Sequence, residues 1–233
     1  MLIAGFPAGS FGTNCYVVAT GPGQECVVVD PGQDAERGIE EIVAEHRLRP
    51  VAVLLTHGHI DHVWSVVPVC GAHDIPAYIH PADRALLTDP TRGLSSAVGQ
   101  MLGGMTFSEP SDVRRLGSEP VITIAGLDFT VDVTPGHTPG SVTFRLGEAA
   151  LLSGDLLFAG SIGRSDLPGG NYDDIMDSLA RVILPLPDEL PVLPGHGSDT
   201  TIGRERATNP FLREAAGLMG DTAPRGTAPT RGL

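Results

Sequence analysis

The sequence predicts an α+β protein, and the arrangement that fits it best is a four-layer αββα sandwich with a functional site along one edge. Two observations predict this fold class: the chain has two strand-rich halves, and each half carries helices of its own. A helix with one apolar face can cover a sheet, so two such halves can stack sheet against sheet. Local propensity alone does not distinguish this sandwich from other α+β layouts.

The N-terminal half alternates strands with a helix. The β-branched runs at 13–19 and 25–30 are separated by the turn-rich spacer TGPGQ, which predicts a hairpin. Residues 34–48 place apolar side chains on one face and charged ones on the other, so we expect an amphipathic helix there. The continuous apolar run at 50–56 predicts a strand that is buried on both faces.

The middle of the chain gives weaker signals. Ser65 can cap a helix that begins near Val66. The run IPAYIH at 75–80 predicts another strand. Residues 89–111 have no clear periodicity and are rich in glycine and serine, so we expect a loop near the site.

The C-terminal half predicts a second sheet. Four short strands follow one another between residues 121 and 155, and the tight turns that join them predict antiparallel pairing. Asn171 caps a helix with one apolar stripe, and LPVLPGHG predicts a last buried strand before a helical segment around 203–216. Without a repeat or a linker, we predict one catalytic domain over 1–217 and a mobile tail over 218–233.

Composition excludes several classes of protein. The net charge of −13 comes without a basic stripe, which argues against a nucleic-acid partner. No run of about 18 apolar residues occurs, so we expect neither a transmembrane helix nor a membrane partner. The first basic residue is Arg37, so the charged start of a secretory signal is missing, and the three cysteines lack metal-site spacing. These observations predict a cytoplasmic protein.

Histidines and aspartates are concentrated directly after apolar strands. The stretch LLTHGHIDHV at 54–63 is the densest case, and TPGHTPGS, ALLSGD and LPGHGSD repeat the pattern later in the chain. Seven candidate metal ligands share this position: His57, His59, Asp61, His62, His137, Asp155 and His196. Scattered polar residues at turns would not be expected to follow so many strand ends.

These residue types favour a centre with two metal ions. In an extended segment His57 and His59 project to the same side, whereas Asp61 and His62 follow on a turn where they can face a second ion. Imidazole and carboxylate suit zinc, iron or manganese, and without thiolates a structural cysteine-type zinc site is excluded. Seven ligands exceed the four that one tetrahedral ion needs, so we predict two divalent ions, zinc in the first place, with iron or manganese as alternatives.

The order of these motifs resembles the metallo-β-lactamase superfamily. THGHIDH is followed by His137, Asp155 and His196 at the spacing of that family, over nearly the whole chain. The segments GSIGRSDLPGGNYDDIMDSL and LPGHGSDTTIGRERATNPFL resemble its short glyoxalase II-like branch in bacteria, whose members are similar to hydroxyacylglutathione hydrolases. The resemblance implies the αββα sandwich with a di-metal site at one edge of the two sheets.

The resemblance also implies how the ligands divide between the ions. One ion would be held by His57, His59 and His137. The second ion would be held by Asp61, His62 and His196, with Asp155 bridging the two. Asp61 would in addition be the catalytic residue that orients the nucleophilic water.

The predicted activity is hydrolysis of a 2-hydroxyacyl thioester, such as S-lactoylglutathione. A di-metal site lowers the pKa of a bound water to roughly 7 and polarises the acyl carbonyl. A thiolate, whose thiol has a pKa of about 8.5, leaves without protonation. An amine would need a general acid, which the motif set does not offer. The predicted partner is therefore a small-molecule thioester.

The sequence departs from full-length glyoxalase II in two ways that affect recognition of the thiol portion of the substrate. The given sequence stops soon after NPFL, so we expect the glutathione contacts of the C-terminal helical domain to be missing, and the loop after Asp155 has Asp166 where those enzymes have a tyrosine. Arg164 occupies the basic position of that loop and can hold a substrate carboxylate through a bidentate fork, or form a salt bridge to Asp166 or Asp173. These departures favour a thiol other than glutathione.

Other functions stay open at this stage. A persulfide dioxygenase of the same superfamily shares the Gly-Arg-x-Asp stretch at 163–166 and would bind one iron through His57, His137 and Asp155. Hydrolysis of a lactone or a β-lactam would use the same ligand set. A metal-stabilised binding module without turnover would need only a closed site, for which seven ligands are too many.

Overall fold

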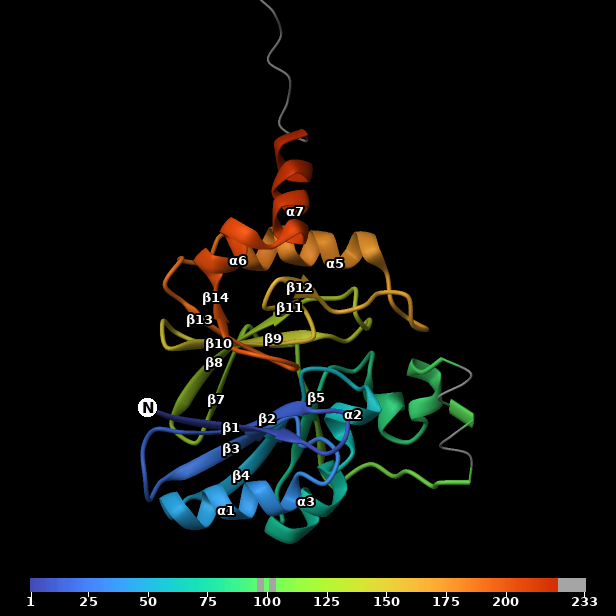
Figure 1. Ribbon diagram of the computed structural model, residues 1–233. Helices are drawn as coiled ribbons and strands as arrows, with labels where there is room; N and C mark the ends of the chain where they lie inside the picture. The colour runs from blue at the N-terminus through green and yellow to red at the C-terminus, as the bar shows by residue number, and fades with distance from the viewer. Residues whose placement is uncertain (96–98, 101–103, 222–233) are drawn as a thin grey trace, which may run out of the picture.

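The computed structural model describes residues 1–95, 99–100 and 104–221 of the chain. Two six-stranded sheets lie face to face, and helices cover the outer face of each sheet (Figure 1). The layers therefore follow the order helix, sheet, sheet, helix. The predicted four-layer αββα sandwich is confirmed. Within the described ranges, every helix is too short or too polar to span a bilayer.

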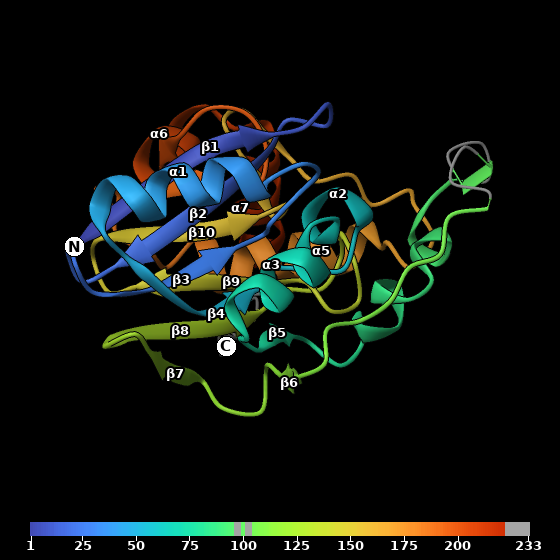
Figure 2. The same ribbon diagram turned by 90° about the horizontal axis from the view of Figure 1, so that it is seen from below.

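The first sheet is built by the N-terminal half, in the spatial order β1-β2-β3-β4-β5-β6. Its strands are β1 (Leu2–Ala8), β2 (Thr13–Ala19), β3 (Glu25–Val29), β4 (Arg49–Leu54), β5 (Ala77–Ile79) and β6 (Val113–Arg115). The helical elements are α1 (Glu36–His46), α2 (Ile60–Val63), α3 (Val66–His73), η1 (Arg84–Leu87) and η2 (Pro90–Gly93). Helices α1 and α3 cover the outer face, and the green segment with η1 and η2 projects beside the sandwich on the side of α2 (Figure 2).

The second sheet is built by the C-terminal half, in the spatial order β14-β13-β10-β9-β8-β7. Its strands are β7 (Val121–Ile124), β8 (Leu127–Val133), β9 (Val142–Leu146), β10 (Ala150–Gly154), β13 (Pro191–Pro194) and β14 (Thr200–Thr201). A small separate sheet pairs β11 (Leu157–Phe158) with β12 (Ser161–Ile162). The helices are α5 (Tyr172–Ser178), the π-helical η3 (Leu179–Ile183), α6 (Ile202–Thr208) and α7 (Pro210–Asp221).

Apolar side chains fill the three spaces between the four layers. In β2, Val17 packs in the cluster under the helices and Val18 packs in the cluster between the sheets, and both are fully buried. Phe129 and Phe144 pack edge to face in the central cluster, with ring centroids 6.3 Å apart. Burying a side chain of this size contributes about 1.5–3 kcal/mol. Because inner strands are covered on both faces, they read as continuous apolar runs.

Strand direction brings the polar strand ends to one edge. In the first sheet β3, β4 and β5 run parallel. In the second sheet β8, β10 and β13 share one direction, since β9 is antiparallel to both β8 and β10, and β13 is parallel to β10. Asp30, His57, His137, Asp155 and His196 follow the carboxyl ends of β3, β4, β8, β10 and β13. This is why residues distant in sequence meet.

Several local predictions are confirmed. Strands β2 and β3 form the predicted hairpin, and the four strands β7 to β10 are antiparallel neighbours in series. Asn171 caps α5, because its side-chain oxygen accepts hydrogen bonds from the backbone N–H groups of Asp173 and Asp174 at 2.9 and 3.2 Å. The predicted loop over 89–111 contains η2, and its residues 96–98 and 101–103 lie outside the described residues.

Other details differ from the sequence-based expectation. Ser65 precedes α3 as predicted, but its hydroxyl does not cap that helix; it donates to Glu36 Oε2 at 2.9 Å and accepts from Ala35 N. The last helical segment is split at Pro210, which cannot continue a helix from α6. Helix α7 extends to Asp221, so the predicted tail starts within a helix, and 222–233 lie outside the described residues.

The strands at the two opposite edges of the first sheet, β1 and β6, were not predicted. Strand β1 contains Gly5 and Pro7, which lower strand propensity, yet proline is tolerated on an edge strand. Strand β6 has only three residues, two of them arginines, and short charged strands are common at sheet edges.

Candidate metal centre

The structure brings all seven predicted ligands together in one cluster. Their ligand atoms form overlapping groups in which every pair of atoms lies within 4.8 Å. We call His57, His59 and His137 the first group, and Asp61, His62 and His196 the second group. Asp155 forms a further group with His57 and His62. The first and second groups contain the residues that the family resemblance assigns to the two ions, and the division of the ligands between ions stays a prediction.

The first group is almost completely enclosed. His57, His59 and His137 are 1%, 5% and 3% exposed. His137 Nε2 lies 2.8 Å from His59 Nδ1 and 3.2 Å from His57 Nε2. Three ring nitrogens therefore converge within ligand distance of a common point.

The second group is more open. His62, in the short helix α2, is fully buried, while the side chains of His196 and Asp61 are 30% and 19% exposed. His196 Nε2 lies 3.1 Å from Asp61 Oδ2 and 3.3 Å from His62 Nε2. Two imidazole nitrogens and a carboxylate oxygen meet here, a donor set that suits a divalent cation.

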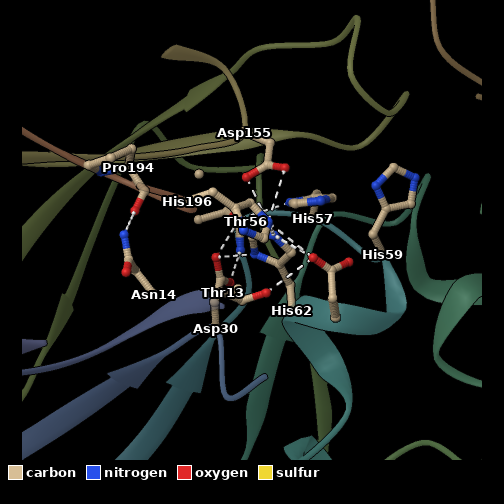
Figure 3. Close-up of polar contacts among 12 residues, drawn as sticks. Thr13, Asn14, Asp30, Thr56, His57, His59, His62, Asp155, Pro194 and His196 are labelled. Carbon is tan, nitrogen blue, oxygen red and sulfur yellow. Dashed lines mark hydrogen bonds and ion pairs between the residues drawn. The ribbon is translucent and has the colours of Figure 1, made fainter. Parts of the chain in front are cut away.

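Asp155 lies between the two groups, and Figure 3 shows it projecting from the second sheet towards histidines carried by the first. Its Oδ2 is 3.5 Å from His137 Nε2 in the first group, and its Oδ1 is 3.4 Å from His62 Nε2 in the second. Oδ1 is buried and has no hydrogen-bond partner among the described residues. A buried carboxylate oxygen without a donor requires an explanation, and a bound cation provides one. The donor set therefore fits a metal centre.

Outward hydrogen bonds fix the orientation of three rings. Each ring places Nδ1 against an oxygen acceptor: Thr56 Oγ1 for His57 at 3.0 Å, Asp30 Oδ2 for His62 at 2.9 Å and the Arg164 carbonyl for His137 at 2.7 Å. In a neutral ring whose Nδ1 donates to that oxygen, the Nε2 lone pair points into the cluster. Converging lone pairs repel one another unless a cation lies between them.

Burial keeps His57 and His59 of the first group neutral. Burial lowers the pKa of His57 well below its ordinary value, and the neighbouring His62 lowers it further. Burial and the adjacent His137 lower the pKa of His59 to about 3. Neutral imidazole is the form that coordinates a metal, so these rings do not have to release a proton to bind one.

The carboxylates carry the negative charge of the cluster. Burial opposes ionisation of Asp61 and Asp155, but His62 and His196 beside them keep the pKa of both carboxyl groups below the ordinary value. Burial by itself would lower the pKa of His62, yet Asp155 and Asp61 raise it well above the ordinary value. A proton and a metal cation therefore compete for the position next to these carboxylates.

Three supporting residues were not predicted. Asp30 is 2% exposed and, besides orienting His62, accepts from Thr56 N at 2.8 Å. Thr13 Oγ1 donates to Asp61 Oδ2 at 3.1 Å. Asp83 accepts hydrogen bonds from the loops that carry the first group. Asp30 directly follows an apolar strand run, as Asp155 does, so that signal was available; the other two have none.

The loop that carries His196 is tied to the start of β2. Asn14 Nδ2 donates to the carbonyls of Pro194 and Gly197 at 3.0 and 2.9 Å, and the first of these bonds is visible in Figure 3. A Cβ on Gly195 would lie 2.2 Å from Asp155 Oδ1. Glycine at this position is therefore required for Asp155 to approach the cluster.

A cavity of about 390 Å³ opens beside the cluster. Its wall contains ligands of both groups together with apolar side chains such as Phe158, Ile162 and Leu167. Arg164 also lines it and forms a two-pronged ion pair with Asp166, at 2.8 and 2.7 Å. Of the two predicted roles for Arg164, the salt bridge to Asp166 is present, and its substrate role stays a prediction.

Comparison with known proteins agrees with this geometry. The family model described as Metallo-beta-lactamase superfamily matches residues 8–196. An uncharacterized protein of Mycobacterium tuberculosis is 48% identical over 91% of this chain and 98% of its own length. The hydroxyacylglutathione hydrolase GloC of Haemophilus influenzae is 33% identical over 88% of this chain and 95% of its own length.

Solved structures show the same architecture. The B3 metallo-β-lactamase BLEG-1 aligns with a TM-score of 0.81 and 42% identity, over 91% of this chain and 99% of its own. TTHA1623, whose crystal structure is of a di-iron-bound form, aligns with a TM-score of 0.75 and 40% identity, over 90% of this chain and 100% of its own. With a His/Asp cluster at the sheet edge and these matches over most of its length, the chain belongs to the metallo-β-lactamase superfamily, as a metal-dependent hydrolase.

Proposed function

We propose that the protein hydrolyses a 2-hydroxyacyl thioester, S-lactoylglutathione or an analogue with another thiol, at a centre of two divalent ions. The observation that carries the proposal is Asp155, whose two oxygens face the two ligand groups beside an open cavity. Zinc is the ion we expect first, with iron or manganese as alternatives. The proposed branch is the glyoxalase II-like one.

The chain's own residues would divide the work as follows. The first group would hold one ion, the second group the other, and Asp155 would bridge them. Ions held in this way lower the pKa of a bound water and polarise an acyl carbonyl. Asp61 stays ionised, is held in place by Thr13, and lines the cavity, so it can accept a hydrogen bond from a water there and orient it.

The leaving group favours a thioester over an amide. A thiolate departs without a proton, since its pKa is about 8.5. An amine would have to be protonated, and the low pKa of His59, about 3, removes this cavity-lining ring as an acid at neutral pH. The similarity to GloC over nearly the whole of both chains supports the same substrate class.

Hydrolysis of a β-lactam is the second candidate, because BLEG-1 is titled a B3 metallo-β-lactamase and is 42% identical. Both reactions would use the same ligands, so only substrates can separate them. A persulfide dioxygenase would need three ligands for one iron, whereas seven ligand side chains converge in this cluster. The larger set supports two ions and a hydrolytic reaction.

Arg164 would contribute to binding of the thiol portion of the substrate. The guanidinium of Arg164 pairs with Asp166 at an exposed position. To form a bidentate ion pair with a substrate carboxylate, it must first release Asp166. Removing Asp166 should therefore strengthen binding of an anionic thioester, by about threefold to fivefold for an exposed pair. Asp166→Ala tests this with S-lactoylglutathione, and Asp112→Ala, which releases the similarly paired Arg114, is the matched control. Equal changes in both variants would remove the assignment.

A substrate panel on metal-replete protein tests the whole proposal. It should contain S-lactoylglutathione, lactoyl thioesters of uncharged thiols, a lactone and a β-lactam, with metals counted in the same sample. We expect two ions per chain and the highest kcat/KM for a thioester. A single iron with oxygen consumption on glutathione persulfide would refute the hydrolase, and a preference for the β-lactam would favour the second candidate.

A further inference from the structure

Asp83 has a buried carboxylate that accepts hydrogen bonds from loops outside its own segment. It follows β5, is 0% exposed, and occupies the position before η1 where an aspartate normally caps a helix. Its side chain makes no capping hydrogen bond to η1. Both carboxylate oxygens instead point away from η1 and accept hydrogen bonds from other parts of the chain.

The donors lie in the two loops that carry the first group. Asp83 Oδ2 accepts from Gly58 N at 2.9 Å and from Thr138 Oγ1 at 2.6 Å, and Oδ1 accepts from Gly140 N at 2.8 Å. Gly58 stands between His57 and His59, and Thr138 directly follows His137. One carboxylate thus contacts the residue between His57 and His59 and the segment that directly follows His137.

The glycines at these contacts allow the carboxylate to come close. A Cβ on Gly140 would lie 2.6 Å from Asp83 Cγ, and one on Gly58 would lie 2.9 Å from the Asp83 carbonyl oxygen. Real Cβ atoms do not approach so closely, so any larger residue would push the loops away from Asp83. Asp83 is therefore in close contact with both loops.

We propose that Asp83 is a positioning residue for the first group: it fixes the separation between the His57–His59 loop and His137, and so sets the metal affinity of that group alone. The inference rests on the two-ion centre proposed above. The second group has different supports, since Asp30 holds His62 and Thr13 holds Asp61. Loss of Asp83 should therefore weaken one group and spare the other.

The variant Asp83→Asn tests this, because it keeps the shape but replaces one acceptor oxygen with an NH₂ group. At least one of the three donors then faces another donor. Loss of a partner that orients ligands weakens metal binding by about 10- to 100-fold. We expect that loss for Zn²⁺ at the first group, measured by competition against a chromophoric chelator.

Two backgrounds separate the groups. In His196→Ala the second group lacks a ligand, so Zn²⁺ affinity reports on the first group; in His59→Ala the reverse holds. Adding Asp83→Asn should lower Zn²⁺ affinity in the first background by about 10- to 100-fold and leave it within about twofold in the second. Thr138→Val, which removes a single donor to Asp83, should act in the same direction with a smaller loss.

Glu205 provides a matched control for a purely structural role. It is also 0% exposed and also accepts three hydrogen bonds, from Thr200 Oγ1, Gly160 N and Asn209 Nδ2. Glu205→Gln should lower the melting temperature as Asp83→Asn does, without changing the Zn²⁺ affinity of either group.

Three outcomes would overturn the assignment: unchanged first-group affinity in Asp83→Asn, equal loss in both groups, or the same loss in Glu205→Gln. If Asp83→Asn does not fold, Thr138→Val decides in the same way. The test uses no thioester. A protein that binds two ions and hydrolyses none of the panel would refute the proposed function and leave the role of Asp83 standing.

Discussion

The first and second ligand groups share Asp155 but differ in how they are enclosed and supported. All three side chains of the first group are at most 5% exposed, whereas His196 and Asp61 of the second are 30% and 19% exposed. In the first group, Asp83 contacts the backbone, and Thr56 and the Arg164 carbonyl contact the rings of His57 and His137. In the second group, Asp30 contacts His62 and Thr13 contacts Asp61. The second group is therefore the more open half of the centre, although ligands of both groups line the cavity.

Replacing Asp155 should remove the distinction between the groups, because its two oxygens face the two groups. Asp155→Asn takes away one acceptor oxygen and the negative charge that attracts two cations. We expect Zn²⁺ affinity to fall by more than about 100-fold at both groups, the upper end of what a lost outer partner costs. Metal analysis after dialysis and a chelator titration measure it.

The exposed Asp128, on β8 away from the cluster, supplies the control for the loss of one charge. Asp128→Asn should retain both ions. If Asp155→Asn kept its full metal content, the position of Asp155 between the groups would have no bearing on the ions.

Replacing Asp61 should break the second group and leave the first. Asp61→Ala removes a ligand and the carboxylate proposed to orient the water, so we expect hydrolysis of the preferred thioester to fall by about 100- to 10,000-fold. The first group should keep one ion, and far-ultraviolet circular dichroism should match that of the parent protein. Unaltered turnover would count against the role of Asp61.

Chelation should remove the ions in two steps. The more exposed second group should release its ion first and lose the hydrolytic activity with it, and the enclosed first group should follow slowly. Removing an ion present at 100 times its Kd costs about 2.7 kcal/mol of stability. That corresponds to a fall in Tm of about 5–10 °C for each ion in a chain of this size. Stopped-flow chelation with calorimetry checks both, and release in a single phase would contradict the difference between the groups.

The convergence of the seven candidate ligands could be predicted from sequence, whereas the residues that support them could be predicted only in part. Ligands sit where a polar residue follows an apolar strand, and strand direction then brings those ends together, so pattern and topology suffice. Asp30 carries the same signal after β3. Asp83 does not, because its contacts are with Gly58 and Gly140, 25 and 57 residues away, through backbone groups that every sequence contains.

The same limit explains what was missed in the fold. Strand β1 lies at a sheet edge, and its pairing with β2 rather than its own composition makes it a strand. Because Gly5 and Pro7 lower its strand propensity, the sequence did not predict it. Ser65 has the right residue type and position for a helix cap, but its hydroxyl donates to Glu36, 29 residues away. A tertiary contact therefore determines the partner of this hydroxyl.

The smallest expected effect concerns Thr13, which supports the second group through one hydrogen bond. Thr13→Val keeps the side-chain volume and removes the hydroxyl that donates to Asp61 Oδ2 at 3.1 Å. A hydrogen bond to a charged group contributes about 1.5 kcal/mol, so we expect Zn²⁺ affinity at the second group to fall by about tenfold, with the first group unchanged.

Thr143→Val is a matched control for this change, because Thr143 is equally buried and its hydroxyl has no hydrogen-bond partner among the described residues. It should leave both affinities unchanged, since no bond to the cluster is lost. Chelator competition on the two variants gives the comparison. A loss at the first group in Thr13→Val, or the same loss in Thr143→Val, would show that packing near the sheet edge sets metal affinity, and that the two groups are not supported independently.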